Sequence, residues 1–162
     1  MVREVKVVLD PDVRKLCIRP YYNHPKGCPN YGKKPGCPPQ APMLGGVLDL
    51  AEPVFAVWAE FDLAAHRKKM LKKHPLWSKR QADCCLYWQG TLLKELRHVV
   101  ANFCTMRLLF RICDKIEAVF CPEAMGVNVT ATMAGAGVNL EWPPENTVRK
   151  VALVGTSVKK GE

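Results

Sequence analysis

The sequence predicts an α/β fold, with a central mixed sheet, flanking helices and a proline-rich cysteine loop in a single domain. Three observations predict it. Valine-rich runs typical of strands alternate with segments of helical periodicity along the 162 residues. This length and a hydrophobic content of 48% are sufficient for one domain with its own core. A loop at 17–39, rich in proline, glycine and cysteine, precedes an α/β body at 47–155.

The first half of the chain contains two predicted strands and one short helix. Residues 2–9 alternate weakly and are rich in valine, which predicts a strand ending at Asp10-Pro11. Residues 54–63 have the β-branched and aromatic content of a second, buried strand. The pattern of 62–73 is helical, and Pro75 ends this helix because proline has no backbone N–H.

Ser78 is the predicted N-cap of the longest helix. One apolar face with a period near 3.6 residues continues along it, formed by Ala82, Cys85, Leu92, Leu96, Val99 and Phe103. Cys85 lies on this face, so we interpret it as a small core residue rather than as a ligand. Cys84 lies to one side of the face and is expected to be half-exposed.

The segment after this helix allows more than one interpretation. Within 106–120, the runs RLLFRI and IEAVF each fit a strand or a short turn of helix. Farther on, VNVTAT alternates with period two, whereas Pro122 and Glu123 suit a first helical turn. We favour a helix from Pro122 to about Ala134, ended by a glycine of the following GAG.

Two further strands are predicted near the end of the sequence. Residues 138–142, VNLEW, follow the glycines and precede a Pro-Pro break. Residues 148–155, VRKVALVG, form a continuous apolar run typical of a buried strand. We expect the residues after this strand to fray.

The cellular compartment follows from what the sequence lacks. No apolar run has the length needed to span a bilayer, and the N-terminal MVREVKVVLDPDV has acidic residues where a signal peptide has its apolar segment. We therefore expect a cytoplasmic protein without a membrane partner. Thiols stay reduced there, so the eight cysteines are interpreted as metal ligands, redox groups or small buried residues rather than as disulfides.

The cysteine loop, residues 17–39, contains Cys17, Cys28 and Cys37 among prolines, glycines and tyrosines. It buries too little apolar surface to offset the entropy of ordering it, so it must be pinned by a cross-link or stay disordered. Three sulfurs at wide intervals make a metal the leading candidate for this cross-link. We therefore expect 1–162 to form a single metal-binding domain.

The spacing of the cysteines favours an iron-sulfur cluster over zinc. Structural zinc sites usually contain a C-x2-C knuckle, and this loop has none. Iron-sulfur clusters accept ligands from wider loops, and three of the cysteines here are followed directly by proline, which keeps the ligand out of regular structure. We expect a [4Fe-4S] cluster, with zinc as the alternative cofactor.

A site of thiolates needs a fourth ligand from the second half of the chain. With Cys85 assigned to the core, the competing thiols are those of Cys84, Cys104, Cys113 and Cys121. Cys121 is favoured, because a helix that begins at Pro122 would place it at the N-cap. Free backbone amides and the helix dipole there stabilise a thiolate or an anionic cluster. Cys104 and Cys113 lie among apolar residues and are interpreted as buried thiols.

The motifs CPNYG at 28–32, CPP at 37–39 and CPEAMGVNV at 121–129 resemble those of a prokaryotic family of unknown function. Its members are regarded as metal-binding proteins, with an iron-sulfur cluster as the favoured cofactor. Carried over by position, the resemblance implies metal ligands at Cys17, Cys28, Cys37 and Cys121. Many members have additional cysteines just before the third motif. The nearest one here is Cys113, which is the alternative fourth ligand.

Other residues of the loop have two interpretations each. His24 can replace a cysteine ligand or donate to a cluster sulfur, or it is an exposed loop histidine. Tyr21, Tyr22 and Tyr31 are expected to surround the cluster and limit solvent, and their competing role is ordinary loop packing. The remaining histidines are scattered and show no nucleophile or zinc-protease motif, so catalytic residues stay unassigned.

The formal net charge of +9 predicts attraction to polyanions, including nucleic acid. The densest basic patch lies at 66–80 and contains Arg67, Lys68, Lys69, Lys72, Lys73, Lys79 and Arg80. The competing interpretation of this patch is a solvated helical face.

These observations predict a redox or electron-transfer module that serves an unidentified redox protein partner. Four cysteine ligands leave no coordination site open for a substrate. With only three thiolates, one iron would be open, and the class would change to an enzyme that uses it as a Lewis acid. The alternative function is a zinc-stabilised protein that binds nucleic acid or a protein partner through the basic patch at 66–80.

Overall fold

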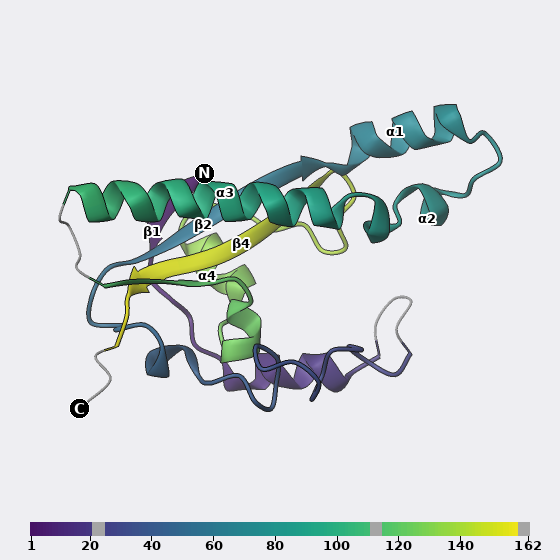
Figure 1. Ribbon diagram of the computed structural model, residues 1–162. Coiled ribbons are helices and arrows are strands. Elements are labelled where there is room, and N and C mark those ends of the chain that lie inside the picture. Colours follow the sequence, from purple (N-terminus) through teal and green to yellow (C-terminus); the bar gives the residue numbers. More distant parts are fainter. Residues whose placement is uncertain (21–24, 111–114, 159–162) are drawn as a thin grey trace.

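The structure is a computed structural model that describes residues 1–20, 25–110 and 115–158 (Figure 1). Its strands form one sheet in the order β1-β2-β4-β3. Their bounds are β1 (Val2–Val5), β2 (Val54–Asp62), β3 (Ile116–Val119) and β4 (Thr147–Thr156). The strands predicted at 54–63 and 148–155 are confirmed, whereas the one predicted at 2–9 ends earlier, at Val5.

The predicted α/β fold is confirmed, but every neighbouring pair of strands is antiparallel, so the expectation of a mixed sheet was wrong. The physical reason is an insertion. β2 and β3 both run antiparallel to β4 and are therefore parallel to each other, and the helical segment 63–109 connects them in the sequence. β4 then takes the place between the two parallel strands, and no parallel ladder forms.

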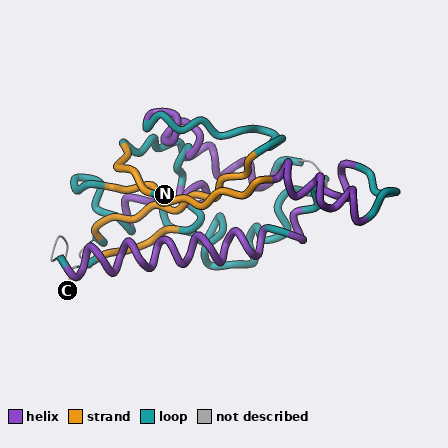
Figure 2. Tube along the Cα trace, turned by 90° about the horizontal axis from the view of Figure 1, so that it is seen from above, coloured by secondary structure: helices purple, strands orange, loops and turns teal. Residues whose placement is uncertain are grey.

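The sheet is covered on both faces. Successive residues of a strand point to opposite faces, so Ala56 and Trp58 belong to one core, whereas Val57 and Ala59 belong to the other. The long helix α3 (Gln89–Leu109) covers the second face with Leu92, Leu96 and Val100. Both views show α3 lying along the length of the central strands (Figures 1 and 2).

The other face is covered by short elements from both ends of the chain. These are α4 (Val129–Gly135), the 3₁₀ helix η2 (Leu44–Gly46) and the residues just before α4. Leu44, Leu48, Val127 and Met133 are fully buried against this face. Apolar packing thus fixes both the segment that follows the cysteine loop and the segment that follows Cys121.

Helix α1 (Leu63–Lys73) confirms the helix predicted at 62–73. The carboxylate of Asp62 caps it by accepting from the amide of Ala65 at 2.7 Å, and the helix ends at Lys73, two residues before Pro75. Together with the next short helix, α1 forms an arm that projects beyond the end of the sheet (Figures 1 and 2).

The single long helix expected after Ser78 is interrupted. Ser78 does cap a helix, through a reciprocal capping box with Gln81, but this helix, α2 (Lys79–Ala82), has only one turn. A 3₁₀ helix, η3 (Cys85–Tyr87), separates it from α3. Consequently Cys85 is exposed, and its assignment to the core was wrong, whereas Cys84 is half-exposed as expected.

A second interruption divides the helix expected from Pro122 to Ala134. Its start is the 3₁₀ helix η4 (Pro122–Met125), and Gly126, with φ +80°, ends it. α4 begins afterwards, with Asn128 as its N-cap and the left-handed Gly137 just beyond its end. The division is held by a tertiary contact, because the carbonyl of the left-handed Gly126 accepts from the amide of Asp10 at 2.8 Å.

The strand expected at 138–142 is a loop. Its backbone is held by side chains instead of a strand ladder: Glu141 accepts hydrogen bonds from the amides of Glu145, Asn146 and Thr147, and Arg149 donates to the carbonyl of Asn139. The segment 106–120 ends α3 at Leu109 and contains β3. Within the described part of the chain, no helix has both the length and the apolar character to cross a bilayer.

Candidate metal centre

The cysteine loop is docked against the segment that carries Cys121. The 3₁₀ helix η1 (Pro11–Ile18) packs on η4, on the side of the sheet away from α3 (Figure 1). The amide of Asp10 donates to the carbonyl of Gly126 at 2.8 Å, and the amide of Asn128 donates to the carbonyl of Val8 at 2.9 Å. This pairing holds the end of η1, where Cys17 lies, beside the start of η4.

Cys28 is fixed directly to Cys17 through the backbone. Its amide donates to the carbonyl of Cys17 at 2.7 Å, across the ten residues between them. The approach requires the buried Gly27, which has φ +77°. A Cβ at this position would lie 2.7 Å from the Cys17 oxygen and 2.9 Å from the Ile18 carbonyl carbon, so only glycine permits the contact.

Cys37 is positioned by turns and by an arginine. Its amide donates to the carbonyl of Lys34 at 2.9 Å, and its own carbonyl accepts from the amide of Ala41 at 3.0 Å. The guanidinium of Arg14, in η1, donates to the carbonyls of Pro39 at 3.1 Å and Ala41 at 2.7 Å. Arg14 therefore ties the end of the loop to the helix that carries Cys17. Its sequence context gave no signal for this role.

The four predicted ligands lie within electrostatic range of one another. Burial raises the pKa of the Cys17 thiol, and negative charge on Cys28, Cys37 and Cys121 raises it further. The pKa of Cys121 is also raised. Desolvation is the largest cause, and negative charge on Cys37 and Cys28 makes a smaller contribution in the same direction. The structure thus brings Cys17, Cys28, Cys37 and Cys121 into one neighbourhood, although two ends of the chain supply them.

Cys121 is an N-cap residue, as predicted, but the helix after it differs from the predicted one. η4 is a single 3₁₀ turn and not the first turn of a thirteen-residue helix, so the expected helix dipole is largely absent. A cation takes over part of that role, because Lys150 of β4 lowers the pKa of Cys121. Glu123 acts in the opposite direction, and desolvation raises the pKa of its own carboxyl group. The effect of Lys150 depends on tertiary contact and cannot be recognised in the sequence around Cys121.

A cavity of about 500 Å³ opens beside two of the four cysteines, Cys17 and Cys28. Tyr31 lines it together with Lys26 and Lys33, and the role of Tyr31 beside a cluster stays a prediction. No group of three or more His, Cys, Asp or Glu residues in 1–20, 25–110 and 115–158 is placed to hold a metal ion. The role of the four cysteines as ligands stays a prediction.

The remaining candidates lie elsewhere or outside the described residues. Cys104 of α3 is half-buried against the second core, where burial raises the pKa of its thiol, in agreement with the buried thiol expected there. Cys84 and Cys85 lie in the connection between α2 and α3. The residues whose predicted roles fall outside the described ranges are Tyr21, Tyr22, His24 and Cys113.

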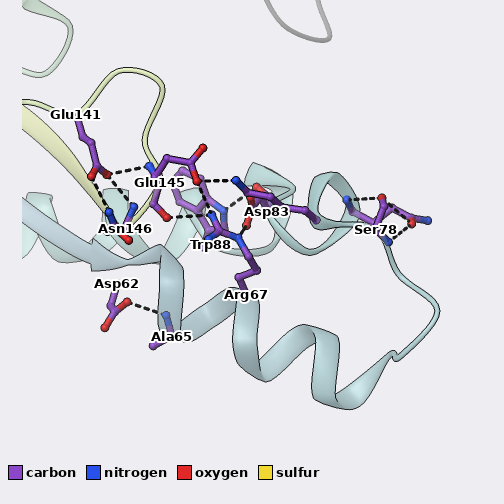
Figure 3. A network of polar contacts seen from close by, with 11 residues as sticks. Asp62, Ala65, Arg67, Ser78, Asp83, Trp88, Glu141, Glu145 and Asn146 are labelled. Carbon is purple, nitrogen blue, oxygen red and sulfur yellow. Dashed lines mark hydrogen bonds and ion pairs between the residues drawn. The ribbon is translucent and has the colours of Figure 1, made fainter.

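The basic patch at 66–80 contains paired and exposed cations. Arg67 is only 17% exposed; its Nε donates to Asp83 at 2.7 Å (Figure 3), and this hydrogen bond raises the pKa of the guanidinium. Lys79 pairs with Glu145 at 2.5 Å. Arg67 therefore joins α1 to the end of α2, and Lys79 joins the arm to the loop before β4. The exposed members of α1 are Lys68, Lys69, Lys72 and Lys73.

A scan against protein-family models, a search of the curated proteins and a search of the solved structures find no match to this chain. The arrangement of the four cysteines is therefore the basis on which a function is proposed.

Proposed function

We propose that the protein binds a [4Fe-4S] cluster through Cys17, Cys28, Cys37 and Cys121 and acts as a redox or electron-transfer module. One observation carries the proposal: cysteines from both ends of the chain lie close together, so that Cys28 and Cys37 raise the pKa of the Cys17 and Cys121 thiols. The docking of η1 on η4 and the hydrogen bond between the Cys17 and Cys28 backbones hold them there.

The chemistry of the donor set supports a cluster. Thiolates that lie close together are stabilised by a positively charged centre, and a bound metal would reverse the upward shift of the Cys17 and Cys121 pKa. Each thiolate of a [4Fe-4S] cluster binds a different iron, which suits ligands supplied by separate segments. The cluster with its thiolates is an anion, and the nearby Lys26, Lys33 and Lys150 would offset its charge.

Full coordination by cysteine favours electron transfer over substrate activation. The proposal includes an unidentified redox protein as partner and the cytoplasm as location, because its thiols must stay reduced. If Cys121 is not a ligand, one iron is open and the class becomes an enzyme that uses Lewis-acid chemistry.

Anaerobic purification followed by iron and sulfide analysis tests the proposal. We expect a brown protein with thiolate-to-iron charge-transfer absorbance, and four irons per chain for a complete cluster. Single serine substitutions of the four cysteines should lower the iron content, whereas the matched control Cys85→Ser, at an exposed cysteine far along the chain, should not. A colourless protein without iron after reconstitution, or equal iron content in all five variants, would contradict the proposal.

A second candidate is a zinc-stabilised protein that binds nucleic acid or a protein partner. The observation that favours it is the position of Lys68, Lys69, Lys72 and Lys73, which are exposed on an arm that projects from the sheet (Figures 1 and 2). Stoichiometric zinc without colour, together with binding of a labelled oligonucleotide that Lys68→Glu/Lys69→Glu abolishes, would support this function. Stoichiometric iron would reject its zinc component.

A further inference from the structure

The cysteine loop is rich in cations. Residues 13–48 contain six lysine or arginine residues and no aspartate or glutamate. Arg14 is turned inward to the carbonyls of Pro39 and Ala41. The other five are exposed: Lys15, Arg19, Lys26, Lys33 and Lys34. Lys15 pairs with Asp12, and Glu123 lies near Cys17 and Cys121, so the excess of positive charge lies on the loop side of the site, where it would attract an acidic surface from a distance.

Exposed apolar side chains lie among these cations. Ile18 is 54% exposed and Tyr31 is 38% exposed, and both line the cavity beside Cys17 and Cys28. Lys26 and Lys33 line the same cavity, and neither has an ion-pair partner among the described residues. Apolar side chains surrounded by polar and charged ones are typical of a protein interface.

We infer that the rim of this cavity, formed by Ile18, Lys26, Tyr31 and Lys33, docks an acidic electron-transfer protein. The inference rests on the function proposed above and specifies the chemistry of the partner. An electron carrier must come close to the cofactor, and the rim adjoins two of the four cysteines. Complementary charge would steer the encounter, and the small apolar centre suits the limited area of a short-lived redox complex.

The exposed lysines of α1 provide a matched control for charge. They lie on the arm, which projects away from the cysteine loop (Figure 1). The double variants Lys26→Glu/Lys33→Glu and Lys68→Glu/Lys69→Glu change the net charge equally, but only the first reverses the charge of the rim. A third variant, Lys26→Gln/Lys33→Gln, removes the rim charge without introducing repulsion.

Binding of a plant-type ferredoxin, an acidic [2Fe-2S] protein, tests the inference by biolayer interferometry. At about 10 mM salt, where the Debye length is about 30 Å, we expect the Glu rim variant to bind at least about tenfold more weakly than wild type, and the Gln variant to lie between them. The arm variant should stay within about twofold of wild type. Raising the salt to about 150 mM, where the Debye length is about 8 Å, should weaken wild-type binding.

The outcomes separate this inference from the proposed function, because binding and iron content are measured on the same samples. Weaker binding of the rim variants with unchanged iron supports the docking surface. Three outcomes would overturn it. The rim and arm variants weaken binding equally, or binding does not depend on salt. In the third, a labelled oligonucleotide binds through the same rim lysines more tightly than ferredoxin does. Wild-type protein without iron overturns the proposed function, whatever the binding result.

Discussion

Replacing Gly27 by alanine tests whether a backbone contact between Cys17 and Cys28 holds the candidate site. Gly27 has φ +77°, a conformation that costs alanine about 1–2 kcal/mol. The new Cβ would also lie 2.7 Å from the carbonyl oxygen of Cys17, which is backbone and must move. Movement there breaks the 2.7 Å hydrogen bond from the Cys28 amide, which is worth about 0.5–1.5 kcal/mol.

We therefore expect Gly27→Ala to lower the free energy of unfolding by about 1.5–3.5 kcal/mol, the sum of the conformational and hydrogen-bond costs. The same loop offers a matched control in Gly32. Its φ is also positive, +68°, but a Cβ there would have no neighbour within 4 Å. Gly32→Ala should lose only the conformational share, about 1–2 kcal/mol. The difference between the two variants isolates the contact at Cys17.

Two measurements check the reasoning. Urea unfolding of the reduced, metal-free protein gives the free energies, provided that the slope of the transition is equal in the two variants. Iron content after anaerobic reconstitution shows whether the displaced Cys28 still binds, and we expect Gly27→Ala to retain less iron than Gly32→Ala. Equal stability and equal iron content in the two variants would refute the idea that the contact positions the site.

Three further predictions concern the body of the protein. Arg67→Met leaves the carboxylate of Asp83, 22% exposed, without its partner, so the substitution should cost about 1–3 kcal/mol of stability and lower the melting temperature. An unchanged melting temperature would contradict the structural role of this pair. Glu141 has its pKa lowered to about 2 by backbone amides, so its contribution to stability is complete above its ordinary pKa of 4.5 and is lost as the pH falls toward 2. Glu141→Gln should therefore flatten the stability profile between these two values in acid titrations followed by circular dichroism, and an unchanged profile would argue against this role. Leu96→Ala, at a fully buried position, should cost about 2–5 kcal/mol in urea unfolding, whereas Leu86→Ala, 77% exposed, should cost little; similar losses would contradict the packing of α3.

The sequence predicts the elements whose signals are local. β2 and β4 are recognisable because both are apolar on both faces, and α1 is recognisable from its periodicity and from Pro75 after its end. The interruption after α2 has a distant cause, because Asp83 binds Arg67 and its carbonyl accepts from the indole of Trp88. No pattern within the helical segment contains that information.

The division at Gly126 shows the same limit. Its carbonyl accepts from the amide of Asp10, which is far away in sequence. For the candidate site, the sequence identifies the four cysteines, because their chemistry and motifs are local properties. It does not identify Arg14 or Lys150, since their roles exist only after the loop and β4 have taken their places. Gly27 is an intermediate case, because a glycine next to a candidate ligand is visible, whereas its contact with Cys17 is not.

The insertion of β4 between β2 and β3 has a consequence for the order of events in the cell. β4 follows β2 and β3 in the sequence, yet it forms the longest pairing of the sheet, with β2, and also pairs with β3. Until it emerges from the ribosome, β2 and β3 have no common neighbour, and the nascent chain keeps apolar surface open to chaperones. Insertion of the proposed cluster should accordingly follow the synthesis of β4, because the segments that gather the four sulfurs rest on a sheet that β4 closes.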